Sequence, residues 1–92
     1  MLEYSKKLSV LYVEDDATLR SATHKIFLNY FDMVDVAVDG HDGLYQYLEY
    51  KKSTDNFYDL VITDINMPRM NGIEMAEVIM TENPEQSLIF IT

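Results

Sequence analysis

The amino-acid sequence predicts an α/β protein with a doubly wound parallel sheet. Short apolar runs rich in strand-forming residues alternate with amphipathic segments of helical period, which gives the order β-α-β-α-β-α-β. Helical connections of this kind require consecutive strands to run parallel and to be joined by right-handed crossovers. The chain has 92 residues, of which 48% are hydrophobic, so we expect one compact domain over residues 1–92.

The first half of the chain contains two expected strands and two expected helices. Residues 8–13, LSVLYV, form an apolar run that ends at acids, and residues 33–38, MVDVAV, alternate as a strand with two unlike faces. Residues 16–31 should form a helix with Asp16 as N-cap. Residues 39–52 should form the second helix, followed by the loop STDN. The expected apolar stripes are Leu19, Ala22, Ile26, Phe27 and Tyr30 on the first helix, and Leu44, Tyr47 and Leu48 on the second.

The second half contains a strand, a helix and a further strand. Residues 57–63, FYDLVIT, are expected to form the third strand, and residues 87–92, SLIFIT, the fourth. Asn71 and Glu74 have the spacing of a capping box at the start of the third helix. Pro84 should end that helix, because proline cannot continue it. The buried stripe expected here is Ile73, Ala76, Ile79 and Met80.

Composition excludes several classes of function. The formal net charge of −9 argues against binding nucleic acid or anionic membranes through bulk electrostatics. The absence of cysteine excludes disulfides and thiolate metal sites and is compatible with a reducing compartment. No apolar run is long enough for a signal peptide or a membrane span. We therefore expect a soluble, cytoplasmic protein.

Acidic residues follow the first and third strands, at the edge of a parallel sheet where ligands usually bind. Glu14, Asp15 and Asp16 end the first strand, Asp64 ends the third and Thr92 ends the fourth. Carboxylates that converge repel one another and favour a cation. An oxygen-only ligand set without nearby His or Cys favours Mg²⁺, and an Asp beside Mg²⁺ can attack phosphorus. The second strand ends at residues 39–40, which we interpret as an ordinary polar turn.

The motifs LYVEDD, VITDINMPRMNG and LIFIT, in this order and spacing, resemble the receiver domain of bacterial two-component response regulators. The resemblance covers the whole chain. It implies a flavodoxin-like receiver fold from the first to the fourth strand, without the last helix-strand-helix segment. It further implies a signalling module that is not an enzyme, that binds Mg²⁺ and that accepts a phosphoryl group from a sensor histidine kinase. An output domain or downstream protein is a further implied partner.

The resemblance also implies roles for individual residues. Asp64 would be the phosphoacceptor, and Asp15 and Asp64 would bind Mg²⁺ directly, with Glu14 acting through water. Asn66 would offer its backbone carbonyl to the metal, and Thr92 would bind the phosphoryl group through its hydroxyl. Asp16 falls just after the acidic pair, where the family varies, and is left out of the metal shell.

Two departures from the family pattern affect what we expect of this chain. Receivers carry a Lys at the end of a fifth strand, and no Lys within the 92 residues has that place. The surface with which receivers commonly dimerise or contact an output domain would also be missing. An apolar fourth strand at a sheet edge predicts edge-to-edge association, which light scattering after size-exclusion chromatography would detect.

Other interpretations of the acidic motif are less well matched. A phosphatase of the haloacid dehalogenase type needs a second Asp two residues after its nucleophile, where this chain has Asn66. An EF-hand loop is excluded by Pro68 at a ligand position. A receiver-like module that binds a partner without phosphorylation remains the alternative. His24 and His41 are expected to be surface residues.

Overall fold

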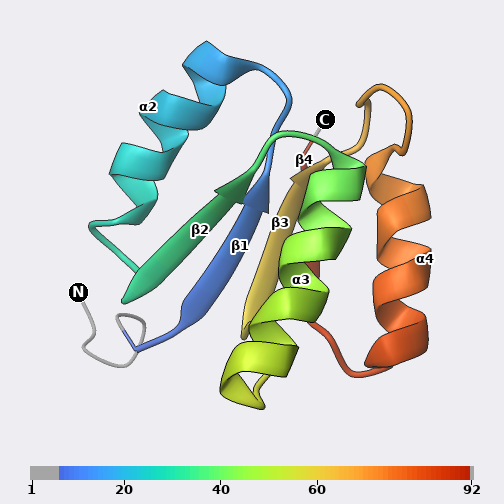
Figure 1. Ribbon diagram of the computed structural model, residues 1–92. Helices are drawn as coiled ribbons and strands as arrows, with labels where there is room; N and C mark the ends of the chain where they lie inside the picture. The colour runs from blue at the N-terminus through green and yellow to red at the C-terminus, as the bar shows by residue number, and fades with distance from the viewer. Residues whose placement is uncertain (1–6, 92) are drawn as a thin grey trace.

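The computed structural model describes residues 7–91, and it contains the expected parallel sheet (Figure 1). All strand pairs are parallel, and the strand order is β2-β1-β3-β4. The strands are β1 (Ser9–Val13), β2 (Met33–Ala37), β3 (Leu60–Asp64) and β4 (Leu88–Ile91). The order reverses beside β1, so the carboxyl ends of β1 and β3 border the switch point of the sheet.

Three helices connect the strands and lie on both faces of the sheet. They are α2 (Ala17–Phe27), α3 (Gly40–Thr54) and α4 (Gly72–Glu82). Asp16 caps α2 as expected, accepting from the N–H of Leu19, and the predicted capping box of Asn71 and Glu74 is present at α4. Helix α3 continues two residues into the expected STDN loop and ends at a left-handed Asp55. The α/β fold class and the element order predicted from the sequence are thus confirmed.

Each face of the sheet has its own core. Helices α3 and α4 pack side by side on one face, over a core that includes Leu11, Val13, Tyr47 and Met75, while α2 alone covers the other face (Figure 1). On the α2 face, Tyr12 meets the ring of Phe27 edge-on at 5.2 Å between ring centroids. One helix covers less of a sheet than two, so the α2 face is the more exposed of the two.

The apolar stripes predicted for all three helices are covered only in part, and on α3 Leu48 is 39% exposed. Helix α2 buries none of its residues fully, and Leu19 and Ile26 are 50% and 56% exposed. On α4, Ala76 and Ile79 are buried as predicted, and Met75 is fully buried. By contrast, Ile73 and Met80 are 42% and 39% exposed and border an open hollow beside β4. Periodicity locates the apolar side of a helix, but exposure depends on what packs against that side.

Side chains from both helix layers bind the outer edge of β2. The Nε2 of His24 on α2 lies 3.0 Å from the carbonyl oxygen of Val34, and the Nε2 of Gln46 on α3 donates to the carbonyl of Val36 at 2.8 Å. His24 is therefore half-buried and hydrogen-bonded rather than a simple surface residue. These two bonds occupy outward-facing carbonyls of an edge strand.

The opposite edge, β4, is more open within residues 7–91. Ile89, Phe90 and Ile91 are between 39% and 49% exposed. The predicted association through this strand stays a prediction. None of the helices in the described part of the chain has both the length and the apolar character needed to cross a bilayer.

Candidate functional site

Three acidic side chains come together at the carboxyl edge of the sheet. Glu14 and Asp15 follow β1, Asp64 is the last residue of β3, and these two strands are hydrogen-bonded neighbours. Each of the three side chains offers an oxygen within 4.8 Å of the other two. The structure thus brings together three of the acids singled out from the sequence, while Asp16 instead caps α2.

Glu14 is the buried member of this acidic cluster, with 4% of its surface exposed. Its Oε2 accepts the backbone N–H of Asp16 at 3.1 Å, which folds the side chain back toward the loop. Its carbonyl accepts from Arg20 Nη1 at 2.7 Å. Burial raises the pKa of the Glu14 carboxyl above its usual range, and the negative charges of Asp64 and Asp15 raise it further.

The donor set of the cluster fits a hard divalent cation. Its ligands are carboxylate oxygens, and among residues 7–91 no Lys or Arg forms an ion pair with any of the three. Three anionic groups this close, one of them buried, are electrostatically unfavourable without a counter-charge. Mg²⁺ is typically bound in this way, through one or two carboxylates with the remaining positions left to water and substrate.

The backbone after Asp64 is held by close packing against Gly72. The Gly72 N–H donates to the Ile65 carbonyl at 2.9 Å, and a Cβ added at Gly72 would lie 2.2 Å from the Asp64 carbonyl oxygen. Only glycine fits this approach. Asn66 is exposed in the intervening loop, two residues past Asp64, and Thr92 lies outside the described residues.

A cavity of about 360 Å³ opens beside the acidic cluster on the α2 face. Its lining residues are Tyr12, Glu14, Leu19, Thr23, Asp64 and Ile91. Tyr12 is almost completely buried, and this burial is the main cause of the raised pKa of its hydroxyl. The carboxylates of Glu14 and Asp64 therefore border a hollow with a largely apolar lining.

The turn after β2 was interpreted from the sequence as an ordinary polar turn, but its Asp39 is buried and connects two elements. Asp39 is 6% exposed, caps α3 by accepting from the N–H of Asp42, and forms an ion pair with Arg69 of the loop between β3 and α4. The Asp42 N–H and the Arg69 guanidinium together hold the pKa of Asp39 below its usual range. The acid-glycine helix start was a visible signal for the cap, but nothing local in the sequence indicated the partner.

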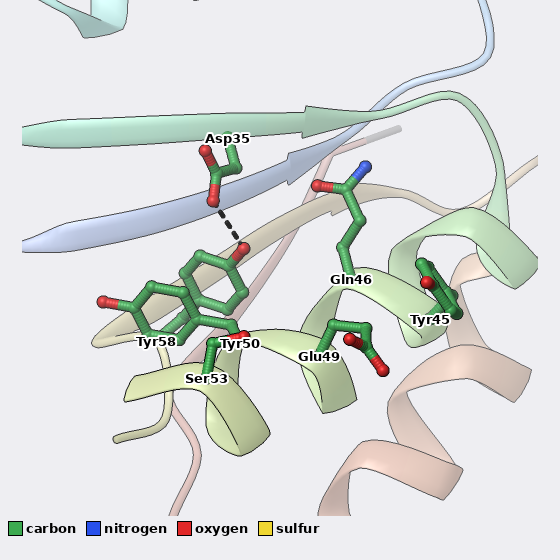
Figure 2. A pocket seen from close by; sticks show the side chains of 7 residues that line it. All are labelled: Asp35, Tyr45, Gln46, Glu49, Tyr50, Ser53 and Tyr58. Atoms are coloured by element: carbon green, nitrogen blue, oxygen red, sulfur yellow. Dashed lines mark hydrogen bonds between the residues drawn. The ribbon is translucent and has the colours of Figure 1, made fainter. Parts of the chain in front are cut away.

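A second hollow, of about 220 Å³, lies between β2 and α3 (Figure 2). The hydroxyl of Tyr58 donates to Asp35 at 2.6 Å there, and the ring of Tyr58 stacks on that of Tyr50 with 4.0 Å between centroids. Burial, followed by the Asp35 carboxylate, raises the pKa of Tyr58. Asp35 thus satisfies a buried hydroxyl at mid-strand, away from the carboxyl edge of the sheet.

The parallel order 2-1-3-4 and an acidic cluster at the switch point define an α/β domain with an acidic edge whose donors suit a cation. Residues 10–92 match the response regulator receiver domain family, so the chain belongs to that family and to two-component signalling. The fold is a flavodoxin-like receiver fold up to its fourth strand, and the acidic cluster matches the receiver Mg²⁺ site. The family predicted from the sequence motifs is confirmed.

Relatives and solved structures agree with this assignment. The transcriptional regulatory protein DltR of Streptococcus agalactiae is 31% identical over 85 residues, which cover 92% of this chain and 35% of DltR. A protein-glutamate methylesterase of Geobacter sulfurreducens is 31% identical over 90 residues, covering 96% of this chain and 23% of the relative. This chain therefore spans about a third or less of the length of these relatives.

Two solved structures show the same fold. The N-terminal domain of an uncharacterized protein from Wolinella succinogenes superposes with a TM-score of 0.79 at 33% identity, over 91% of this chain and 63% of that one. The complex of CheX and CheY with BeF3 and Mg from Borrelia burgdorferi gives a TM-score of 0.78 at 28% identity, over 90% and 60% of the two chains.

Proposed function

We propose that this chain is the phosphoacceptor receiver of a two-component system and that it takes a phosphoryl group from a histidine kinase onto Asp64. The observation that carries the proposal is the meeting of Glu14, Asp15 and Asp64 at the switch point, each with an oxygen within 4.8 Å of the others. A buried acid that forms no ion pair with a Lys or Arg of residues 7–91, next to a carboxylate at a strand end, supports a site built for a metal and an anionic substrate.

In the proposed reaction, an oxygen of the Asp64 carboxylate attacks phosphorus in line with the bond to the donor. An O–P bond forms, the N–P bond of phosphohistidine breaks, and its electron pair stays on the imidazole nitrogen. Asp64 suits this role because β3 and the Gly72 contact fix its backbone. Positioning of this kind contributes much of the acceleration when a bimolecular transfer becomes effectively unimolecular.

Asp15 and Asp64 would hold Mg²⁺ directly, Asn66 would contribute its backbone carbonyl, and Glu14 would act through water. When bound, Mg²⁺ supplies neutralisation of the charge on the transferring phosphoryl oxygens. Thr92 is proposed to bind the phosphoryl group through its hydroxyl after transfer. The protein is an acceptor and switch in this scheme, and its partners are a histidine kinase and an output domain or downstream protein, with the cytoplasm as its compartment.

The test is exposure of the full-length protein that carries this sequence to Mg²⁺ and acetyl phosphate, followed by intact mass measurement. We expect the mass of one phosphoryl group to be gained, and we expect Asp64→Asn to abolish the gain. Asp32→Asn is the matched control, because Asp32 is an exposed acid that precedes β2 at the opposite end of the sheet. A wild-type protein that gains no mass would leave phosphorylation-independent partner binding as the function.

A further inference from the structure

The loop between β3 and α4, residues 65–71, docks on the start of α3 through two contacts. Arg69 Nη2 lies 2.5 Å from Asp39 Oδ2. Next to this ion pair, Gly40 packs so closely on the loop that an added Cβ would lie 2.3 Å from the carbonyl oxygen of Met70. These contacts join the loop after the proposed acceptor to a strand end that takes no part in the acidic cluster.

The backbone of Arg69 has a conformation that an arginine rarely adopts. Its φ of 67° lies in the left-handed region, and the Met70 N–H donates to the Pro68 carbonyl at 2.8 Å across it. A three-residue turn with a positive φ at its centre is the rare and strained form of the γ-turn. Such a conformation persists where surrounding contacts hold it, and the contact available to the Arg69 side chain is Asp39.

The two partners of the ion pair differ in exposure. The Asp39 side chain is only 9% exposed and is also fixed by its bond to the Asp42 N–H at 2.8 Å, whereas the Arg69 side chain is 67% exposed. The carboxylate is therefore the more constrained partner, and the guanidinium is the more accessible to water. Attachment of Arg69 closes the loop on α3.

We propose that Asp39 and Arg69 form an ionic latch that positions loop 65–71 for metal binding. The loop is then fixed at its base, where Gly72 packs against the Asp64 carbonyl, and at Arg69, which is held on α3. Asn66, whose carbonyl is the proposed metal ligand, lies in the sequence between Asp64 and Arg69. Both latch residues act through the loop as positioning residues, and the inference rests on the proposed function of the acidic cluster.

The decisive variant is Arg69→Gly. Glycine adopts a positive φ without strain, so this change removes the ion pair while relieving the backbone. Loss of a positive charge from the protein should by simple electrostatics strengthen Mg²⁺ binding, whereas loss of the latch should weaken it. We expect the Mg²⁺ dissociation constant, from calorimetry on the full-length protein, to rise about tenfold, as for other outer-shell residues.

Two further variants separate the ion pair from other roles of these residues. Asp39→Asn keeps a good N-cap and removes the charge, so it should weaken Mg²⁺ binding as Arg69→Gly does, and the double variant should lose little more. Arg69→Lys keeps the charge and should retain most of the affinity. Lys51→Ala is the matched control. It removes the exposed ion pair with Asp55 at the far end of α3 and should leave the Mg²⁺ dissociation constant unchanged.

Hydrogen exchange measured without Mg²⁺ gives a readout independent of the proposed function. In Arg69→Gly and Asp39→Asn, the backbone N–H groups of residues 65–71, Pro68 excepted, should exchange faster than in wild type and in Lys51→Ala. Unchanged loop exchange in both variants, or Mg²⁺ affinity that rises in Arg69→Gly, would overturn the latch. If wild type binds no Mg²⁺ but its loop still exchanges more slowly than that of the two variants, the latch would stand and the proposed metal site would be overturned.

Discussion

Glu14 and Asp39 are both buried acids at the carboxyl edge of the sheet, one after β1 and the other after the neighbouring strand β2, and they are 4% and 6% exposed. Their surroundings shift their pKa values in opposite directions. Burial and the nearby Asp64 and Asp15 raise the pKa of Glu14, whereas the Asp42 N–H and Arg69 lower that of Asp39. Burial alone therefore does not decide the state of an acid at this edge.

The difference separates an acid that is paired with a cation of the protein from one that, in the described part of the chain, is not. Asp39 has its counter-charge from within the described chain, and its charge helps to hold a helix start and a loop. The Glu14 carboxyl lies near the like charges of Asp64 and Asp15, and the Arg20 guanidinium binds the backbone carbonyl of Glu14 instead. Among residues 7–91 the Glu14 carboxylate has one backbone donor, the N–H of Asp16. A bound cation would lower the electrostatic cost of ionising a buried acid of the second kind.

The largest expected effect comes from Asp64→Asn. Because the acceptor oxygen is lost, the variant should form no acyl phosphate, while Asp39→Asn should still be phosphorylated when Mg²⁺ is saturating. Intact mass after treatment with acetyl phosphate measures both. Complete phosphorylation of Asp64→Asn would show that another residue is the acceptor. The acidic cluster of Glu14, Asp15 and Asp64 would then not be the phosphorylation site.

Addition of Mg²⁺ should stabilise the fold through the acidic cluster. At a concentration about 100-fold above its dissociation constant, a ligand that binds only the folded state adds about 2.7 kcal/mol to the free energy of unfolding. Urea unfolding with and without Mg²⁺ measures this gain. In Asp15→Asn the gain should shrink, whereas Asp32→Asn should respond as wild type does.

Glu14→Gln should stabilise the metal-free protein. The neutral amide removes the repulsion and can still accept the Asp16 N–H, so we expect a gain of about 0.5–2 kcal/mol at neutral pH. A raised folded-state pKa means that wild-type stability falls as pH rises from the ordinary Glu range through the folded value. Chemical unfolding across that range should show this decline in wild type, and a pH profile of Glu14→Gln with the same decline would contradict its assignment to Glu14.

Asp39→Asn should have the smallest effect on stability. Asn retains the cap, and the lost ion pair has one exposed partner, so we expect a cost of about 0.5 kcal/mol at neutral pH. Because the folded pKa of Asp39 is lowered, its contribution is present above the ordinary Asp range and is lost as pH falls below it. The difference in unfolding free energy between wild type and variant should therefore vanish in acid, opposite to the trend for Glu14.

The sequence predicted what local patterns determine. Apolar runs marked the strands, Asp16 and the pair Asn71 and Glu74 marked helix starts, and the parallel order brought Glu14 and Asp64 to one edge. These features depend on residues within a few positions of one another, or on a topology that the crossovers impose.

Features that depend on distant packing were not predictable in the same way. Asp39 and Arg69 are 30 residues apart, and their pairing needs a positive φ at an arginine, which no sequence rule anticipates. Likewise, whether Ile26 or Met80 is covered depends on neighbouring elements and not on the period of their own helices. Covered and uncovered apolar residues look alike in a sequence.

The side-chain hydrogen bonds along β2 make this edge of the sheet less available than the β4 edge for pairing with a further strand. A strand that approached β2 would find the carbonyls of Val34 and Val36 already taken by His24 and Gln46, one from each helix layer. β4 carries no such side-chain bonds within residues 7–91, and edge strands without protection are templates for pairing. Any extension of this sheet, whether by its own chain or by another, is therefore favoured on the β4 side.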